Sequence, residues 1–186
     1  MPKKKARRAS LADPSGLKPL DGNKIQVIIE TPKDSRNKYS FDEDLRIFSL
    51  KKVLPAGMTF PYNFGFVPST RAEDGDPTDV LVLMDEPAFP GCLVKCRMIG
   101  IIEGMQGKKK KGERNDRIVA VEDGNHSYAH IKHVQKLGKE FCEELEEFFV
   151  NYHDLDGKKY RILGVKGPSE ARRRLEDGMK MRGKRT

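Results

Sequence analysis

Three aspartates crowd into one short turn near the middle of the chain. Asp74, Asp76 and Asp79 stand around a glycine and a proline, directly before the apolar run 80–84. Neighbouring carboxylates repel one another, so at least one would keep its proton unless a cation lies among them. Carboxylate oxygens are hard ligands of the kind that Mg²⁺ prefers. The spacing therefore predicts a divalent-metal site, and Mg²⁺ is the cation that we expect.

Three known types of site place acidic residues at similar spacing. An EF-hand loop would need an acid or Asn, then Gly, then Glu at the places where this sequence has Thr78, Asp79 and Asp85. The DxDxT motif of haloacid-dehalogenase-like phosphatases, with Asp74 as nucleophile, should follow an apolar strand, but the apolar run comes after the acids here. The third type is D-G-D-P-x-D followed by an apolar strand, and residues 74–83 match it.

The apolar pattern on both sides of the turn predicts many short strands. Strands are expected over 24–30, 38–41, 45–53, 80–84, 92–103, 117–121 and 158–165, with the second and third paired as a hairpin. Residues 137–152 repeat apolar side chains at helical spacing, and a short basic helix begins at Pro168. This order lacks the regular alternation of a doubly wound sheet. It predicts an α+β, mainly β fold, a small barrel with one long and one short external helix.

The basic charge of the chain lies at its two ends. The 186 residues favour one core, and the formal net charge is +8. Five basic residues in 1–8, with seven basic and two acidic residues in 172–186, give the ends +10, so residues 9–171 carry −2. We expect a basic flexible arm over 1–20, one domain over 21–177 and a basic tail over 178–186. A specific nucleic-acid partner is not expected, because the body of the chain is slightly acidic.

The sequence contains no pattern that would direct it to a membrane. No apolar run reaches the ~18 to 20 residues that a spanning helix needs, and no apolar segment follows the basic start as in a signal peptide. Cys92, Cys96 and Cys142 match neither a zinc site nor a redox motif, so reduced thiols are expected. We therefore expect a cytoplasmic protein.

Six segments of the sequence, taken in order, resemble one enzyme family. They are VIIETP at 27–32, NKY at 37–39, FPYNFGF at 60–66, DGDPTDVLVL at 74–83, NDRIVAV at 115–121 and FFVNY at 148–152. Together they extend from about residue 25 to about residue 165, near the spacing of family I soluble inorganic pyrophosphatases. The chain is identified by this resemblance as a divergent, bacterial-type member.

The resemblance implies a fold, a reaction and an assembly. The fold would be a highly twisted five-stranded barrel resembling an OB-fold, with helices outside. The reaction would be hydrolysis of pyrophosphate to two phosphates by a metal-activated water, assisted by several Mg²⁺ ions. The assembly would be a homo-oligomer, with a hexamer favoured.

The matched motifs also imply roles for individual residues. Metal ligands are expected at Asp74, Asp76, Asp79 and Asp116, although the family's D-x-K spacing would place the last aspartate at position 115. Asp76 would orient the attacking water. The other catalytic positions would be Glu30, Lys38, Lys52 and Tyr152. Phosphate would be held by Lys38, Lys52, Arg117 and Tyr152, with Arg117 replacing the family's lysine.

The chain departs from the family pattern at several further positions. The family commonly has Arg at Lys52, Tyr at Phe60 and Phe64, Glu at Ser40 and Asp near Gln106. Two phenol donors and one bidentate guanidinium are thus missing. A weakly active or non-catalytic homologue that binds phosphate or polyanion is therefore the alternative to a pyrophosphatase.

Overall fold

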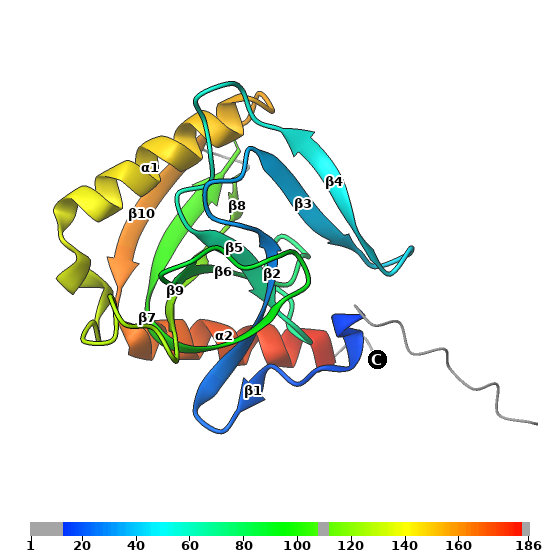
Figure 1. The fold of residues 1–186 in the computed structure, drawn as a ribbon, viewed down its shortest axis with the longest axis vertical. Helices are drawn as coiled ribbons and strands as arrows, with labels where there is room; N and C mark the ends of the chain where they lie inside the picture. The colour runs from blue at the N-terminus through cyan, green and yellow to red at the C-terminus, as the bar shows by residue number, and fades with distance from the viewer. Residues whose placement is uncertain (1–12, 108–111, 184–186) are drawn as a thin grey trace, which may run out of the picture.

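Five strands close on themselves into a twisted barrel (Figure 1). The computed structural model describes residues 13–107 and 112–183. Around the ring, each strand pairs with the next, and the last pairs back with the first. In that order the strands are β2 (Lys24–Thr31), β5 (Asn63–Val67), β6 (Thr78–Leu83), β9 (Arg117–Glu122) and β7 (Leu93–Gln106). The expected five-stranded barrel is confirmed.

Shorter strands extend or flank this ring. β1 (Leu20–Asp21) lies beside β2, whereas β8 (Glu113–Arg114) and β10 (Tyr160–Lys166) lie beside β7. The predicted hairpin is present as a separate two-stranded sheet of β3 (Asn37–Asp42) and β4 (Ile47–Val53). Figure 1 shows this hairpin projecting beyond the ring.

Alternation along the barrel strands divides the core in two. On β6, Val80 and Val82 belong to one apolar cluster, while Leu81 and Leu83 belong to the other. Successive side chains of a strand point to opposite faces. A strand that is buried on both faces therefore has a continuous run of apolar residues in its sequence. The run directly after the acidic turn is therefore central barrel, which gives the turn a rigid support.

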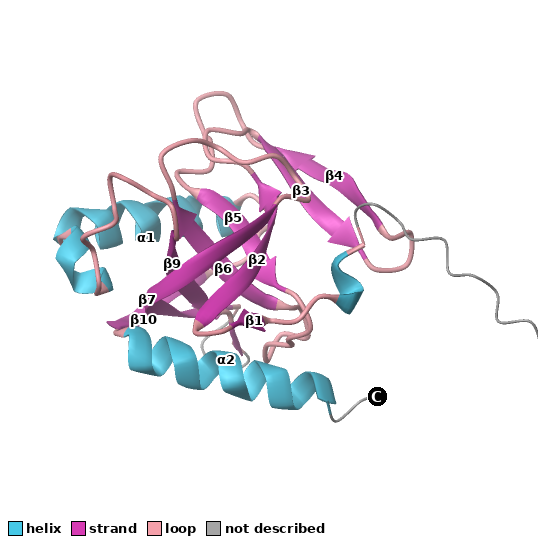
Figure 2. Ribbon diagram, turned by 60° about the horizontal axis from the view of Figure 1, so that its bottom comes forward, coloured by secondary structure: helices cyan, strands magenta, loops and turns pink. Residues whose placement is uncertain are grey.

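Two 16-residue helices cover the outside of the sheet (Figure 2). α1 (Lys139–Asp154) buries Phe141, Leu145 and Phe149 as its spacing predicts, and it follows the 3-10 turn η2 (Val134–Leu137). α2 (Pro168–Gly183) also has 16 residues, so the expectation of a short second helix is wrong. Its buried face is small because it consists of Ala171, Leu175 and Gly178, and this weak apolar signal did not reveal how far the helix continues.

The chain segments at both ends carry more structure than expected. A 3-10 turn η1 (Pro14–Gly16) lies within residues 1–20, which we expected to be a flexible arm, β1 begins at the last of these residues, and α2 continues through residues 178–183. The rest of the expected arm and tail, residues 1–12 and 184–186, lies outside the described residues. No helix within the described ranges combines the length and apolar character needed to cross a bilayer.

Candidate active site

A cavity of about 530 Å³ opens where the acidic turn faces the β3–β4 hairpin. Of the nine residues predicted from the sequence, seven line it: Glu30, Lys38, Asp74, Asp76, Asp79, Arg117 and Tyr152. Carboxylates and cations thus share one cavity, although they come from strands, a turn and a helix far apart in sequence. Lys52 and Asp116 do not line it.

The acidic turn is closed by its own backbone. Gly75 adopts φ +94°, a left-handed conformation that favours glycine. Its N–H donates to the carbonyl of Ala72 at 3.1 Å, and the N–H of Ala72 donates to the carbonyl of Asp76 at 2.7 Å. The N–H of Asp76 donates to Oδ1 of Asp74 at 3.2 Å. The side chain of Asp76 remains exposed, so this carboxylate is the one of the three most open to water.

Parallel pairing of β6 with β9 places Asp79 opposite Arg117. The Nε of Arg117 lies 3.8 Å from Oδ2 of Asp79. Burial nevertheless raises the pKa of Asp79 to about 7, against the lowering effect of Arg117 and Lys38. Burial likewise raises the pKa of Asp74, with Asp76 adding to the rise by charge repulsion. Both carboxylates would be stabilised as anions by an additional cation.

Arg117 is held in place by aromatic rings and carbonyl groups. Its side chain is only 3% exposed, and Nη1 donates to the Tyr160 hydroxyl at 2.7 Å and to the Asn115 carbonyl at 3.2 Å. The guanidinium carbon lies 3.9 Å from the ring centroid of Phe149. Its Nε has no hydrogen-bond partner among the described residues. A buried, fixed guanidinium at a cavity wall is suited to neutralise an anionic oxygen in that cavity.

Glu30, at the end of β2, is tied to the hairpin. It accepts hydrogen bonds from the N–H of Phe41 at 2.8 Å, the hydroxyl of Ser40 at 3.0 Å and Nζ of Lys38 at 3.3 Å. The ammonium of Lys38 also lies 4.3 Å from the ring centroid of Phe64. Ser40, where the family has Glu, therefore binds the retained glutamate, and Glu30 orients Lys38 toward the cavity.

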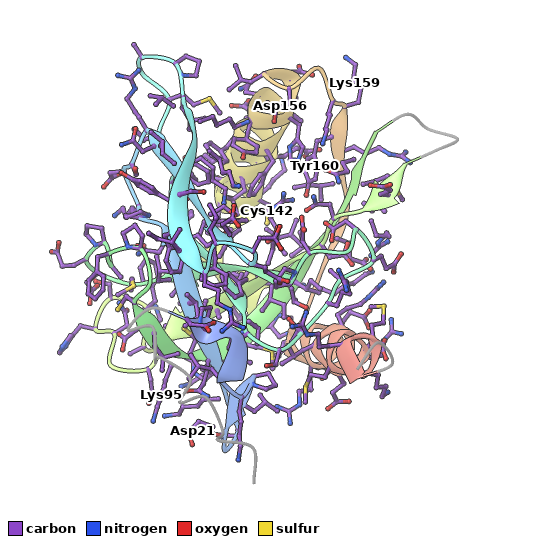
Figure 3. All side chains as sticks on the ribbon, turned by 90° about the vertical axis from the view of Figure 1, so that its right-hand side faces the viewer. Asp21, Lys95, Cys142, Asp156, Lys159 and Tyr160 are labelled. Atoms are coloured by element: carbon purple, nitrogen blue, oxygen red, sulfur yellow. The ribbon has the colours of Figure 1, made fainter. Side chains whose placement is uncertain are left out.

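Lys52 does not line the cavity, but it contacts two residues that do, Tyr152 and Asp156. Its Nζ donates to Oδ2 of Asp156 at 2.8 Å and lies 3.8 Å from the ring centroid of Tyr152. Figure 3 shows Asp156 beside the end of α1 and Tyr160 on β10. Burial raises the pKa of Tyr152 to about 12, so its phenol stays protonated and can donate a hydrogen bond. Lys52 thus braces Tyr152 at the edge of the site.

Asp116 does not lie in the cavity with the other three aspartates. Its Oδ1 accepts from the N–H of Gly104 at 3.0 Å and its Oδ2 from Nη2 of Arg114 at 2.8 Å. Neighbouring residues on an extended chain face opposite sides, so Asn115 and Arg117 line the cavity while Asp116 faces away. Of Asn115 and Asp116, the residue that lines the cavity is therefore Asn115, whose side chain is a neutral amide.

Four cations of the cavity wall were not predicted: Arg46, Arg71, Lys158 and Arg182. Arg71 lies just before the acidic turn, and its Nε donates to the Gly75 carbonyl at 2.8 Å. Lys158 lies in the connection from α1 to β10 and also lines the cavity. Arg71 could have been predicted as a site residue, because it lies close in sequence to the three aspartates of the turn. Lys158 sits in an ordinary polar loop, so no local pattern distinguishes it.

His153 follows Tyr152 but does not supply a cation. It is 4% exposed, its Nδ1 donates to the Phe149 carbonyl at 2.7 Å, and its ring stacks on Tyr160. Burial lowers its pKa to about 4. At neutral pH the ring is therefore neutral and belongs to the support of Arg117.

We expect the buried neutral His153 to make stability fall in acid. Below its ordinary pKa of about 6.5, the unfolded chain binds a proton that the folded chain binds only near pH 4. Between pH 7.5 and pH 5, this histidine should lower the free energy of unfolding by about 2 kcal/mol. Denaturant titrations of the wild type and His153→Asn, which keeps a donor for the Phe149 carbonyl, measure the difference. Parallel pH profiles for the two proteins would contradict the assignment.

The donors of the acidic turn suit a hard divalent cation. Within residues 13–107 and 112–183, no group of three or more His, Cys, Asp or Glu side chains is arranged to hold a metal ion unaided. Mg²⁺ does not require such a cage, because it keeps several waters and usually takes one or two carboxylates together with phosphate oxygens. Asp74, Asp76 and Asp79 offer oxygen donors only, and two of them have raised pKa values. The residues present therefore fit Mg²⁺ bound together with a phosphate ligand.

Comparison with known proteins agrees with this geometry. A family model described as inorganic pyrophosphatase matches residues 27–182. The inorganic pyrophosphatase of Nostoc sp. is 40% identical over 156 residues, covering 84% of this chain and 90% of that protein. Soluble inorganic pyrophosphatase 2 of Chlamydomonas reinhardtii is 33% identical, covering 86% and 81%. The crystal structure of inorganic pyrophosphatase from Thermus thermophilus superposes with a TM-score of 0.84 at 30% identity, covering 92% of this chain and 99% of that one. This chain belongs to the family I inorganic pyrophosphatases.

Proposed function

We propose that the chain hydrolyses inorganic pyrophosphate to two phosphates in a Mg²⁺-dependent reaction, using water as the nucleophile. The observation that carries this proposal is the single cavity in which three aspartates face Lys38 and Arg117. Carboxylates can bind the Mg²⁺ ion, and basic side chains can bind the phosphate groups. The cavity can therefore bind both the cation and the anion of a magnesium pyrophosphate complex. The family to which the chain belongs supports the same reaction.

Phosphate binding would fall mainly to Arg117 and Lys38. Pyrophosphate carries several negative charges, which must be neutralised before a nucleophile can approach phosphorus. Arg117 lines the cavity with a guanidinium fixed by its neighbours, and Lys38 presents an ammonium oriented by Glu30. The protonated phenol of Tyr152 would donate a third hydrogen bond to a phosphate oxygen.

Asp76 would orient the attacking water. Its carboxylate is exposed within the cavity wall, and its backbone is fixed by the hydrogen bonds of the turn. A carboxylate in this place accepts a hydrogen bond from water and directs a lone pair toward phosphorus. The bound metal would lower the pKa of the water and neutralise phosphate charge. Asp74 and Asp79 would hold that metal.

The departures from the family predict a site with fewer donors. Phe60 and Phe64 line the cavity without hydroxyl groups, and Gln106 and Asn115 are neutral where the family has acids. Lys52 is engaged by Asp156. Arg71 and Lys158 add cations on the cavity wall, and in the proposed reaction they compensate for part of the lost phosphate binding.

Phosphate release from pyrophosphate tests this function directly. We expect hydrolysis with Mg²⁺, loss of at least about 90% of it on chelation with EDTA, and recovery when Mg²⁺ is restored, because metal stabilises the transferring phosphoryl group. Binding of pyrophosphate without release of phosphate would instead identify the non-catalytic homologue. A phosphoenzyme at Asp74 would support the aspartyl-phosphatase mechanism.

We also infer a cytoplasmic homo-oligomer, with a hexamer favoured. The hairpin supports association because Leu45, Ile47, Leu50 and Val53 are each more than half exposed there. Sedimentation velocity would measure the assembly, and a purely monomeric protein at micromolar concentration would contradict it.

A further inference from the structure

Helix α2 approaches the acidic turn closely enough to join its backbone. The N–H of Arg71 donates to the carbonyl of Gly178 at 3.0 Å. A Cβ atom on Gly178 would lie 2.8 Å from Oγ1 of Thr78 and 3.1 Å from the carbonyl oxygen of Arg71, so only glycine permits this approach. One end of the acidic turn is thus fixed to the helix.

Arg174 lies one turn earlier on α2 and reaches the same region through its side chain. Nη1 donates to Glu73 at 3.3 Å and lies 3.6 Å from Oδ2 of Asp116. Nη2 donates to Glu103 at 3.3 Å, and Nε donates to Glu170 at 3.2 Å. The guanidinium therefore connects three separate segments of the barrel region with its own helix.

The centre of this network is shielded from water. Glu103 and Asp116 are each 14% exposed, and Nη2 of Arg114 lies 2.8 Å from a carboxylate oxygen of both. Planar guanidinium groups hold several carboxylate oxygens at fixed angles, which a lysine cannot do. Removing one side chain from such a shielded network therefore weakens the hydrogen bonds of the remaining side chains.

The partners of Arg174 are neighbours of functional residues. Glu73 directly precedes Asp74, and Asp116 lies between Asn115 and Arg117, which line the cavity on the opposite side of the strand. The geometry points to Arg174 as a positioning residue that holds the acidic turn in register with the Asn115–Arg117 segment, and so presets the turn for its divalent cation. This inference rests on the proposed function for the use of that cation.

Arg172 provides a matched control on the same helix. It is an arginine two residues away, and its ion pair is with Glu176 inside α2, where both side chains are 40% or more exposed. An exposed pair of this kind contributes little to stability. Arg172→Gln removes the same charge as Arg174→Gln without touching the acidic turn.

The test measures Mn²⁺ affinity by electron paramagnetic resonance, together with hydrogen exchange of the amides in residues 72–76. Arg174→Gln should weaken Mn²⁺ binding roughly 10-fold, as expected for loss of a residue that supports metal ligands. It should also accelerate exchange in the turn and raise the Mg²⁺ concentration for half-maximal hydrolysis. Arg174→Lys should recover part of the loss, and Arg172→Gln should stay within about two-fold of the wild type.

Glu73→Gln keeps the proposal testable if Arg174→Gln fails to fold. This variant removes only the link to the turn and should weaken Mn²⁺ binding about 3-fold. Unchanged Mn²⁺ affinity and exchange in both Arg174→Lys and Glu73→Gln would overturn the inference, as would a wild-type chain that does not bind Mn²⁺. A wild type that binds Mn²⁺ but does not hydrolyse pyrophosphate would refute the proposed function alone, since both binding readouts remain.

Discussion

Replacing Asp76 by Asn is expected to lower kcat for pyrophosphate hydrolysis roughly 1,000-fold, within the range for loss of a general base. The amide has nearly the same shape, so the backbone hydrogen bonds that close the turn can persist. It cannot accept the proton of an attacking water, and it offers a metal or water only a neutral oxygen. Because the Asp76 side chain is exposed, the thermal unfolding temperature should change little.

Asp44→Asn is the control for this experiment. Asp44 is an exposed aspartate in the turn of the β3–β4 hairpin and does not line the cavity. Its substitution removes one negative charge of the same kind and should leave kcat at the wild-type value. Activity of Asp76→Asn close to that of Asp44→Asn would exclude the assigned role of Asp76.

Arg117→Met is expected to affect both activity and stability. The variant removes the buried donor to phosphate and should lower kcat/KM roughly 100- to 1,000-fold, as does loss of one preorganised donor to a developing charge. It also removes the donor to the Tyr160 hydroxyl and the shorter of the two hydrogen bonds to the Asn115 carbonyl, and it leaves Asp79 without its ion-pair partner. The free energy of unfolding should fall by about 3 kcal/mol.

Arg117→Lys and Arg161→Met separate the two effects. Lysine keeps the charge but lacks the guanidinium fork, so it should recover part of the activity and less of the stability. Arg161 is an exposed neighbour of Tyr160 on β10, and its substitution should change neither quantity. Stopped-assay kinetics and urea titration measure them. An Arg117→Met enzyme with wild-type kcat/KM would show that phosphate is held elsewhere.

Local patterns predicted the elements whose apolar spacing is regular. The strands around β6, the hairpin and α1 all follow from alternation or from helical spacing, and each is confirmed. β5 was not predicted, because Pro61 and Gly65 interrupt the aromatic segment 60–66, which overlaps the strand. It is a strand since its backbone pairs on both sides, with β2 and with β6, and these pairings are decided by distant parts of the chain.

The candidate site was predictable in composition but not in the direction of every side chain. The acidic turn could be read directly because its three carboxylates are close in sequence. The motif could not show that Asp116 lies outside the cavity, because a single residue of strand register decides whether a side chain faces the cavity or the opposite side. Lys52 was placed in the site by its motif, but its conformation depends on Asp156, more than one hundred residues away along the chain.

Closure of the ring between β2 and β7 has a consequence for how activity arises during folding. Ile25 pairs with Cys96, so this step joins segments about 70 residues apart. Pairings over such distances are slow, because the entropy of the intervening chain must be lost before any contact compensates for it. Glu30 is the second-last residue of β2, and Arg117 begins a strand that pairs with β7, so both reach their final places only when the ring closes. A refolding chain should therefore gain its secondary structure first and its enzymatic competence last, with no partly active intermediate.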